Sequence, residues 1–467
     1  MISDPLTIDT APICLSYLEA PRRSMKMAEL IGALSHALDM TEGQPPGHCI
    51  RACWIGIQIG TKLGLDNHSL WELYYTIMLK DLGCSSNAAR ICELYATDDL
   101  RFKHDFKLVD SSLTQVLNFV LDHTGVNSGL AERFKNVMSV LRHGGEWSTE
   151  LMQTRCERGA EIAKQLRFSD IVSEGIRGLD EHWDGNGKPY GRATESIPLY
   201  SRIALISQVI DVFCISSGPN ASLKELRKRR GQWFDPELVD IVHDIADEAF
   251  WQTLASETLE ADVINLAPGL HQVELDDDYI DEIAAAFGQV VDTKSPFTAG
   301  HSNRVGLITD LLGQELGLDS EHRRWLKRGA LLHDVGKLGV SNSILDKPGP
   351  LTDDEFETMK EHALFTGQIL SRIDAFKGLA DIAQAHHERL DGKGYPFGLT
   401  DKDITLDTRI ITTADIFDAI TADRPYRGAI PVPQALSIMH KSVGTQLDPE
   451  CYDALVSLTE KYNLTDF

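Results

Sequence analysis

Histidine and carboxylate side chains that could bind metal ions are concentrated in the C-terminal half of the sequence. Seven of them fall in separate segments between residues 301 and 415, and they are His301, His333, Asp334, His362, His386, His387 and Asp415. No cysteine lies in this range, and imidazole nitrogens mixed with carboxylate oxygens suit Mn, Fe or Zn bound as a Lewis acid better than a structural zinc. The set therefore predicts a catalytic metal site.

Lys337 adds a positive charge next to this set. It follows Asp334 by three positions and His333 by four, which places all three near one face at the end of a predicted helix. A cation there could contact a phosphate whose oxygens the metals hold. A lone histidine on an apolar helix is more often a core residue than a ligand, but the adjacent pair His386-His387 before a glycine-rich turn is a far less ordinary pattern.

The segments that carry these residues are predicted to be helices. Apolar residues recur at i, i+3 and i+4 from 301 to 316, and the next helix is expected from 321 to about 337. Thr352 and Glu355 form a capping-box pattern before the helix of His362, and a further helix is expected over about 408–422. No run of alternating residues indicates strands, so the sequence predicts an all-α fold.

The chain also contains a diverged tandem repeat. Residues 27–84 align with 280–337 without a gap, and after a longer insert in the first copy DEHWDGNGKPYG at 180–191 aligns with HERLDGKGYPFG at 387–398. A period of this length indicates duplicated domains rather than a solenoid. The expected organisation is a degenerate first domain over 1–255, a linker over 256–275 and a catalytic domain over 276–467.

The first copy lacks most of the candidate ligands. In this alignment Lys80 replaces His333, Cys84 replaces Lys337, Leu179-Asp180 replaces His386-His387, Gln208 replaces Asp415, and Thr154 replaces His362. Only His48 and Asp81 remain, which are too few for a catalytic site. The retained WDGNGKPYG loop is interpreted as a folding relic, and the first copy as a supporting lobe without chemistry of its own.

Composition excludes several classes of partner. The formal net charge of −25 argues against broad binding to DNA, RNA or an anionic membrane, since these surfaces require a large basic excess. No apolar stretch was expected to cross a bilayer, and the first residues lack the basic start of a secretory signal. The sequence therefore predicts a cytoplasmic protein.

Three long motifs resemble one known family. LLHDVGKLGV at 331–340, HHERLDGKGYPFGL at 386–399 and TADIFDAITADRPYRGA at 413–429 are similar to the HD-GYP family of the HD phosphohydrolase superfamily. The resemblance covers about residues 280–456. It implies an all-α domain with bound divalent metals, usually iron or manganese, that hydrolyses cyclic di-GMP or a related cyclic dinucleotide such as 3′,3′-cyclic GMP-AMP.

The resemblance also implies a role for each candidate residue. One metal is expected on His301, His333, Asp334 and Asp415, and Asp334 bridges to a second metal on His362, His386 and His387. His333, Asp334 and Lys337 are the expected catalytic residues, and Lys337, Arg424, Arg427 and Tyr395 are the expected substrate contacts. Guanidinium groups suit a phosphate because they donate in a fixed fork. Glu388 and Asp391 are interpreted as acids that hold the loop.

One position departs from the family pattern. Members with three metals have a glutamate four residues before the first histidine, where this sequence has Phe297. A phenyl ring cannot bind a metal, so two ions are expected. In the family this tends to accompany release of the linear 5′-phosphorylated dinucleotide without a second cut.

Two other functions were weighed against this one. An HD hydrolase of another nucleotide would need neither the GYP segment nor the RPYR cluster, which disfavours it. A silent effector that binds a cyclic dinucleotide or a protein through the GYP loop fits the first copy better than the second. A protein partner at the GYP loop and a homodimer stay open, as does the choice between the two cyclic dinucleotides.

Overall fold

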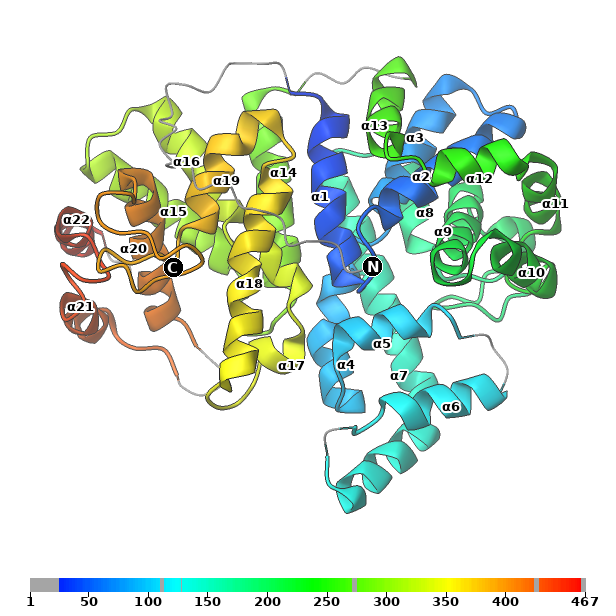
Figure 1. Ribbon diagram of the computed structural model, residues 1–467, viewed down its shortest axis with the longest axis horizontal. Helices are drawn as coiled ribbons and strands as arrows, with labels where there is room; N and C mark the ends of the chain where they lie inside the picture. The colour runs from blue at the N-terminus through cyan, green and yellow to red at the C-terminus, as the bar shows by residue number, and fades with distance from the viewer. Residues whose placement is uncertain (1–24, 110–112, 127, 271–274, 424–427, 463–467) are drawn as a thin grey trace, which may run out of the picture.

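The computed structural model describes residues 25–462, apart from 110–112, 127, 271–274 and 424–427. Within these residues every regular element is a helix, and the β contacts are isolated bridges. The prediction of an all-α fold is confirmed. The two halves of the chain lie side by side, with α1 beside the C-terminal half at the centre of the molecule (Figure 1).

The N-terminal half begins with three long helices and a short turn of 3₁₀ helix, followed by a longer set of helices. Its elements are α1 (Met27–Thr41), α2 (His48–Lys62), α3 (Asn67–Met78), η2 (Cys84–Asn87), α4 (Ala88–Tyr95), α5 (Asp99–Phe106), α6 (Leu113–His123), α7 (Leu130–Gln165), α8 (Asp170–Arg177), η3 (Thr194–Ser196), α9 (Leu199–Ser217), α10 (Pro219–Arg229), α11 (Pro236–Ile245), α12 (Glu248–Leu254) and α13 (Leu259–Leu270). Helix α6 and the first part of α7 extend away from the body (Figure 1).

The C-terminal half repeats this order without the extension. Its elements are α14 (Asp277–Asp292), α15 (His301–Glu315), α16 (Ser320–Leu332), η4 (Val335–Gly339), α17 (Asn342–Leu345), α18 (Asp353–Leu370), η5 (Asp374–Phe376), α19 (Lys377–Gln384), α20 (Leu406–Thr421), α21 (Val432–His440) and α22 (Pro449–Lys461). The capping box predicted at Thr352 and Glu355 is confirmed.

The two halves share apolar packing. One cluster of buried side chains contains Leu34 and Leu38 of α1 together with Leu331, Leu338 and Ile369 of the C-terminal half. Helix α1 packs directly on η4 and α18. Separation of the halves would therefore expose core residues of both to water.

Helix α9 is long and apolar enough to cross a membrane by length and composition alone, which the sequence analysis did not expect. About two thirds of its most apolar window is buried inside the protein (67%). It packs on α2, α8 and α10, so its apolar residues are explained as the core of the first half.

The end of α16 differs from its predicted position. We expected this helix to continue to about Lys337, but it ends at Leu332, and the chain enters η4. The reason lies at Gly336, because a Cβ atom there would be 2.0 Å from the carbonyl oxygen of His362. The close approach of η4 to α18 brings Asp334 and His362 to the same place.

Candidate metal centre

The seven predicted ligands converge from five parts of the C-terminal half. His301 is the first residue of α15, His333 and Asp334 join α16 to η4, His362 lies in α18, His386 and His387 follow α19, and Asp415 lies in α20. Three groups of potential ligand atoms lie within 4.8 Å of one another, and together they include all seven residues.

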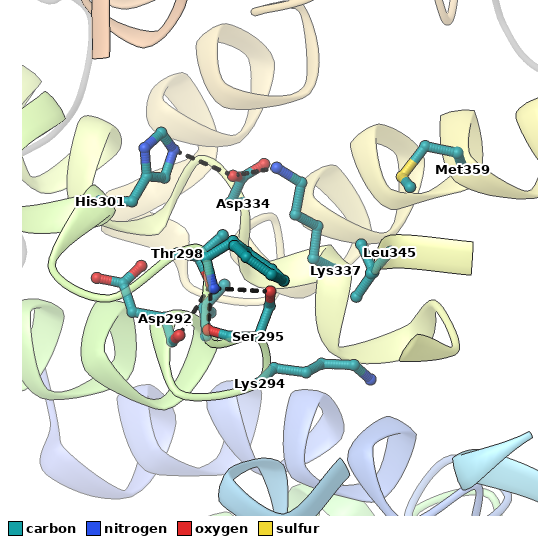
Figure 2. A pocket seen from close by; sticks show the side chains of 11 residues that line it. Asp292, Lys294, Ser295, Thr298, His301, Asp334, Lys337, Leu345 and Met359 are labelled. Carbon is teal, nitrogen blue, oxygen red and sulfur yellow. Dashed lines mark hydrogen bonds and ion pairs between the residues drawn. The ribbon is translucent and has the colours of Figure 1, made fainter. Parts of the chain in front are cut away.

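A cavity of about 140 Å³ opens beside these residues. Lys337 lines it, and its Nζ atom lies 2.5 Å from Oδ2 of Asp334 (Figure 2). The same cavity is lined by Phe297, Leu345 and Met359. An anion that reached Asp334 through this cavity would meet the ammonium group of Lys337.

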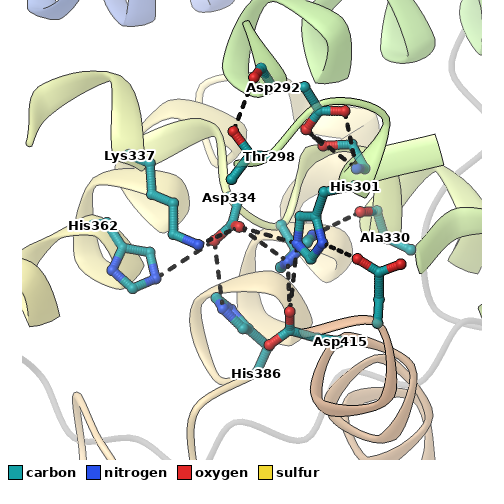
Figure 3. A network of polar contacts seen from close by, with 12 residues as sticks. Asp292, Thr298, His301, Ala330, Asp334, Lys337, His362, His386 and Asp415 are labelled. Atoms are coloured by element: carbon teal, nitrogen blue, oxygen red, sulfur yellow. Dashed lines mark hydrogen bonds and ion pairs between the residues drawn. The ribbon is translucent and has the colours of Figure 1, made fainter. Parts of the chain in front are cut away.

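Asp334 lies between two sets of imidazole groups (Figure 3). Its Oδ2 atom is 3.5 Å from Nε2 of His301 and 3.3 Å from Nε2 of His333. Its Oδ1 atom is 3.6 Å from Nε2 of His362 and 3.7 Å from Nε2 of His386. Two atoms that each bind one ion at about 2.0–2.2 Å lie roughly this far apart. Asp334 is therefore placed to share its two oxygens between two ions.

The remaining predicted ligands complete the two sets. Oδ1 of Asp415 lies 3.4 Å from Nε2 of His301 and 3.7 Å from Nε2 of His333. The ring of His387 packs against that of His386, with centroids 3.9 Å apart, and it belongs to the group that contains His362.

The hydrogen bonds of three histidines leave their ligand atoms free. Nδ1 of His333 lies 2.7 Å from the carbonyl oxygen of residue 330, Nδ1 of His362 lies 2.5 Å from that of residue 359, and Nδ1 of His386 lies 2.5 Å from that of residue 383. Each Nδ1 therefore carries the proton, and each Nε2 presents a lone pair. Among the described residues, these buried Nε2 atoms and Oδ1 of Asp334 have no hydrogen-bond partner. A buried atom of this kind is costly unless it has a partner, and a divalent cation would serve all four.

The local electrostatics favour neutral imidazole and ionised carboxylate. Burial lowers the pKa of His362 to about 4 and the pKa of His386 to about 3. For Asp334 and Asp415 burial alone would raise the pKa, but the surrounding histidines hold both values well below the usual range. These are the protonation states that a metal requires.

Sequence reasoning missed Asp418, which orients the first ligand. Its Oδ2 atom lies 2.7 Å from Nδ1 of His301, and Arg304 donates from Nε to its Oδ1 atom at 2.5 Å. Asp211 makes the same contacts with His48 and Arg51 in the first copy. The agreement of both copies at this position was a visible signal.

The GYP loop lies against the second set of ligands. Glu388 accepts hydrogen bonds from the backbone N–H groups of residues 397, 398 and 399, at 2.6, 3.1 and 2.9 Å. The ring of Tyr395 lies 4.8 Å from that of His387. Arg424 and Arg427, the two predicted phosphate contacts after α20, lie outside the described residues.

The first copy carries protein cations in the corresponding place. Nζ of Lys80 lies 3.1 Å from Nε2 of His48 and pairs with the carboxylate of Asp81. All three side chains are fully buried or nearly so. Burial alone would lower the pKa of Lys80, but Asp81 raises it above its usual value, so the lysine is charged.

A second cation lies where the repeat aligns with His362. A Cβ atom at Gly83 would be 1.9 Å from the carbonyl oxygen of Arg155, as one at Gly336 would meet His362. The counterpart of His362 is therefore Arg155, and the expected Thr154 is wrong by one position. The Nη2 atom of Arg155 donates to Asp180 at 2.5 Å.

Comparisons with known proteins agree on one family. The HD domain family matches residues 127–238 and 286–451. The 3′3′-cGAMP-specific phosphodiesterase 3 of Vibrio cholerae is 51% identical over 94% of this chain and 95% of its own. The cyclic di-GMP phosphodiesterase response regulator RpfG of Xanthomonas campestris is 37% identical over 38% of this chain and 47% of its own.

A solved structure covers both halves. The crystal structure of the cyclic GMP-AMP-specific phosphodiesterase V-cGAP3 of V. cholerae has a TM-score of 0.65 and 46% sequence identity, and it covers 94% of this chain and 99% of its own. The likeness therefore includes the tandem arrangement as well as the C-terminal half.

Proposed function

Because the chain belongs to the HD-GYP family of cyclic-dinucleotide phosphodiesterases, we propose that its C-terminal half hydrolyses 3′3′-cGAMP to a linear 5′-phosphorylated dinucleotide. The observation that carries the proposal is the position of Asp334, with one oxygen facing His301 and His333 and the other facing His362 and His386. Two-ion sites of this kind are typical of phosphoester hydrolysis.

The seven ligands fit two divalent ions, and we propose iron or manganese. One ion would be held by His301, His333, Asp334 and Asp415, and the other by Asp334, His362, His386 and His387. Ions bound there would activate water and polarise the phosphoryl oxygens as Lewis acids. Phe297 lines the adjacent cavity and offers no oxygen, which supports two ions rather than three.

The chain's own cations would hold the scissile phosphate. Lys337 is about four fifths buried (21% exposed) and points at Asp334, so a phosphate there would exchange an ammonium–carboxylate contact for an ammonium–phosphate contact. Arg424 and Arg427 are proposed as further phosphate contacts. Tyr395, which packs on His387, is proposed to border the nucleotide.

The choice of substrate follows the relative that spans nearly the whole chain. The V. cholerae protein with 51% identity is named for 3′3′-cGAMP, whereas relatives named for cyclic di-GMP, such as RpfG, match less than half of this chain. Purified protein loaded with Mn²⁺ or anaerobic Fe²⁺ should cleave 3′3′-cGAMP faster than cyclic di-GMP. A linear dinucleotide with a 5′-phosphate should accumulate, because attack at phosphorus with loss of the 3′ oxygen leaves phosphate on the 5′ side.

Chromatography of a time course and metal analysis test this proposal together. Mononucleotide without a linear intermediate would overturn the role given to Phe297. Three tightly bound ions per chain would overturn the two-ion site. Full turnover by metal-free protein in chelator would overturn the mechanism.

Residues 1–255 are proposed to be a degenerate domain that supports the catalytic domain at 276–467. The shared apolar cluster supports this division of labour. The isolated fragment 270–467 should be less soluble or less active than the full chain, because α1 no longer covers η4 and α18. A soluble and fully active fragment would refute the supporting role. A cytoplasmic location, a protein partner at the GYP loop and a homodimer stay predictions.

A further inference from the structure

A buried carboxylate of the N-terminal half contacts the catalytic half. Asp99 is the first residue of α5, and its side chain is completely buried. Its Oδ1 atom accepts a hydrogen bond from the Ser341 hydroxyl at 3.0 Å and another from the Asn342 N–H at 2.8 Å. Ser341 caps α17 and Asn342 begins it. Asp99 therefore fixes the start of a helix that follows η4.

Two buried ammonium groups lie near the other oxygen of Asp99. Oδ2 is 3.8 Å from Nζ of Lys103 and 4.0 Å from Nζ of Lys294. Burial alone would raise the pKa of Asp99, but Lys294 and Lys103 hold it below the usual value. Without this negative charge, two cations would lie close together inside the protein with no charged partner between them.

Lys294 connects this charge cluster to the cavity beside the metal ligands. Its side chain lines that cavity together with Asp334 and Lys337 (Figure 2). Its ammonium group donates to the carbonyl oxygen of Leu338 at 2.8 Å, directly after Lys337 in the chain. The backbone oxygen of Lys294 accepts a hydrogen bond from Nδ2 of Asn342 at 2.6 Å. The 3₁₀ turn η4 is thus held at its end by groups that Asp99 anchors.

We propose that Asp99 is a positioning residue for the hydrolysis of the phosphodiester. It holds Lys294 and the start of α17, and these hold η4 so that Lys337 points at Asp334 and at the phosphate. The inference rests on the function proposed above. The hydrogen bonds and ion pairs of Asp99 among the described residues involve none of the seven ligands, so its effect on rate would pass through Lys337.

The test compares Asp99→Asn with Asp98→Asn in the full-length, metal-loaded protein. Asparagine keeps the size and an oxygen that can accept from Ser341, but it removes the charge. A small displacement of Lys337 should lower kcat roughly 10- to 100-fold, with metal content equal to that of the parent. Asp98 caps the same helix through the N–H of Arg101 at 3.0 Å, and asparagine caps equally well, so this control should keep the parental kcat.

A second pair of variants separates positioning from a structural role. When Lys337 is already replaced by alanine, adding Asp99→Asn should change kcat by less than about twofold, because both changes act through one cation. An equal loss in both backgrounds, or a loss of bound metal, would show that Asp99 only stabilises the fold and would overturn the inference. Parental kcat in Asp99→Asn would overturn it as well.

The same variants should be measured on 3′3′-cGAMP and on bis(p-nitrophenyl) phosphate. The second substrate needs the ions and Lys337 but no nucleotide recognition. If the parent cleaves only the nitrophenyl ester, the proposed substrate is wrong, and the comparison of Asp99→Asn with Asp98→Asn still decides the inference.

Discussion

Asp334 of the catalytic half lies among imidazole groups whose Nε2 atoms have no protein partner, whereas Asp81 of the N-terminal half is paired with the ammonium group of Lys80. The surrounding helices match, since α2 and α15 both begin at a histidine held by an aspartate and an arginine. In one half the buried carboxylate awaits metal ions, and in the other the chain provides its own cations. The fold needs positive charge at this place, and catalysis needs that charge to be metal.

The largest expected difference between the halves is in turnover. Asp334→Asn should lower kcat more than about 1,000-fold, because both ions lose a shared ligand. Asp81→Asn should leave kcat within about threefold for the molecules that stay folded, because no ion depends on that residue. Initial rates normalised to folded protein by circular dichroism would decide this. A loss in Asp81→Asn similar to that in Asp334→Asn would mean that the first copy takes part in chemistry.

Stability should show the opposite pattern. Lys80→Met leaves the fully buried Asp81 without its cation, and a broken buried pair costs about 3–5 kcal/mol. Lys337→Met, the matched change in the second copy, removes a partly exposed lysine (21%) and should cost less stability but much more kcat. Urea unfolding combined with rates on the same samples would measure both. The comparison fails if Lys80→Met unfolds at the parental urea concentration.

Acid should weaken the first copy through Glu42. Burial alone would raise the pKa of this residue, but Lys107, 2.9 Å away, together with Arg155 and Lys103 lowers it from 4.5 to about 2. A depressed carboxylate pKa gives stability that is present above pH 4.5 and is lost as the pH falls toward 2. The difference corresponds to about 3 kcal/mol.

The Glu42→Gln variant should lack this part of the acid dependence. Its urea unfolding free energy should fall less steeply between pH 4.5 and pH 2 than that of the parent, while Glu132→Gln, on the exposed surface of α7, should follow the parent. Parallel curves for the parent and Glu42→Gln would contradict the assigned role of Glu42.

The smallest expected effect concerns metal removal. Chelation should speed hydrogen exchange of the amides in η4 and α18, where ligands lose their ions. The amides of α2 and η2 should change by less than about twofold, because Lys80 and Arg155 stay in place. Mass spectrometry of exchanged peptides would report both regions in one experiment. Equal acceleration in both halves would show that the first copy also depends on metal.

The motifs were sufficient to predict helices and the set of ligands, because helix periodicity and the HD-GYP motifs are local in sequence. The end of α16 was not predictable, since the chain after Leu332 keeps helical composition and only contact with α18 at Gly336 forces η4. The counterpart of His362 was misplaced because the long insert of the first copy leaves the register free. Gly83 and Arg155 fix that register only in three dimensions.

The connection through Asp99 was also beyond sequence reasoning. Asp99 and Ser341 lie 242 positions apart and belong to segments that the repeat does not align. A buried aspartate next to buried lysines has no periodic signal, and its meaning depends on how the two halves pack.

The bonds from Nδ1 of His333, His362 and His386 to carbonyl oxygens three residues earlier have a kinetic consequence. Because each ring is oriented by its own helix end, the ligands occupy their places before any ion arrives, and little side-chain entropy remains to be lost on binding. Loading and exchange of ions then proceed without refolding. The supply of iron and manganese in the cell, together with the rigid spacing of the rings, would select the ion that the enzyme carries.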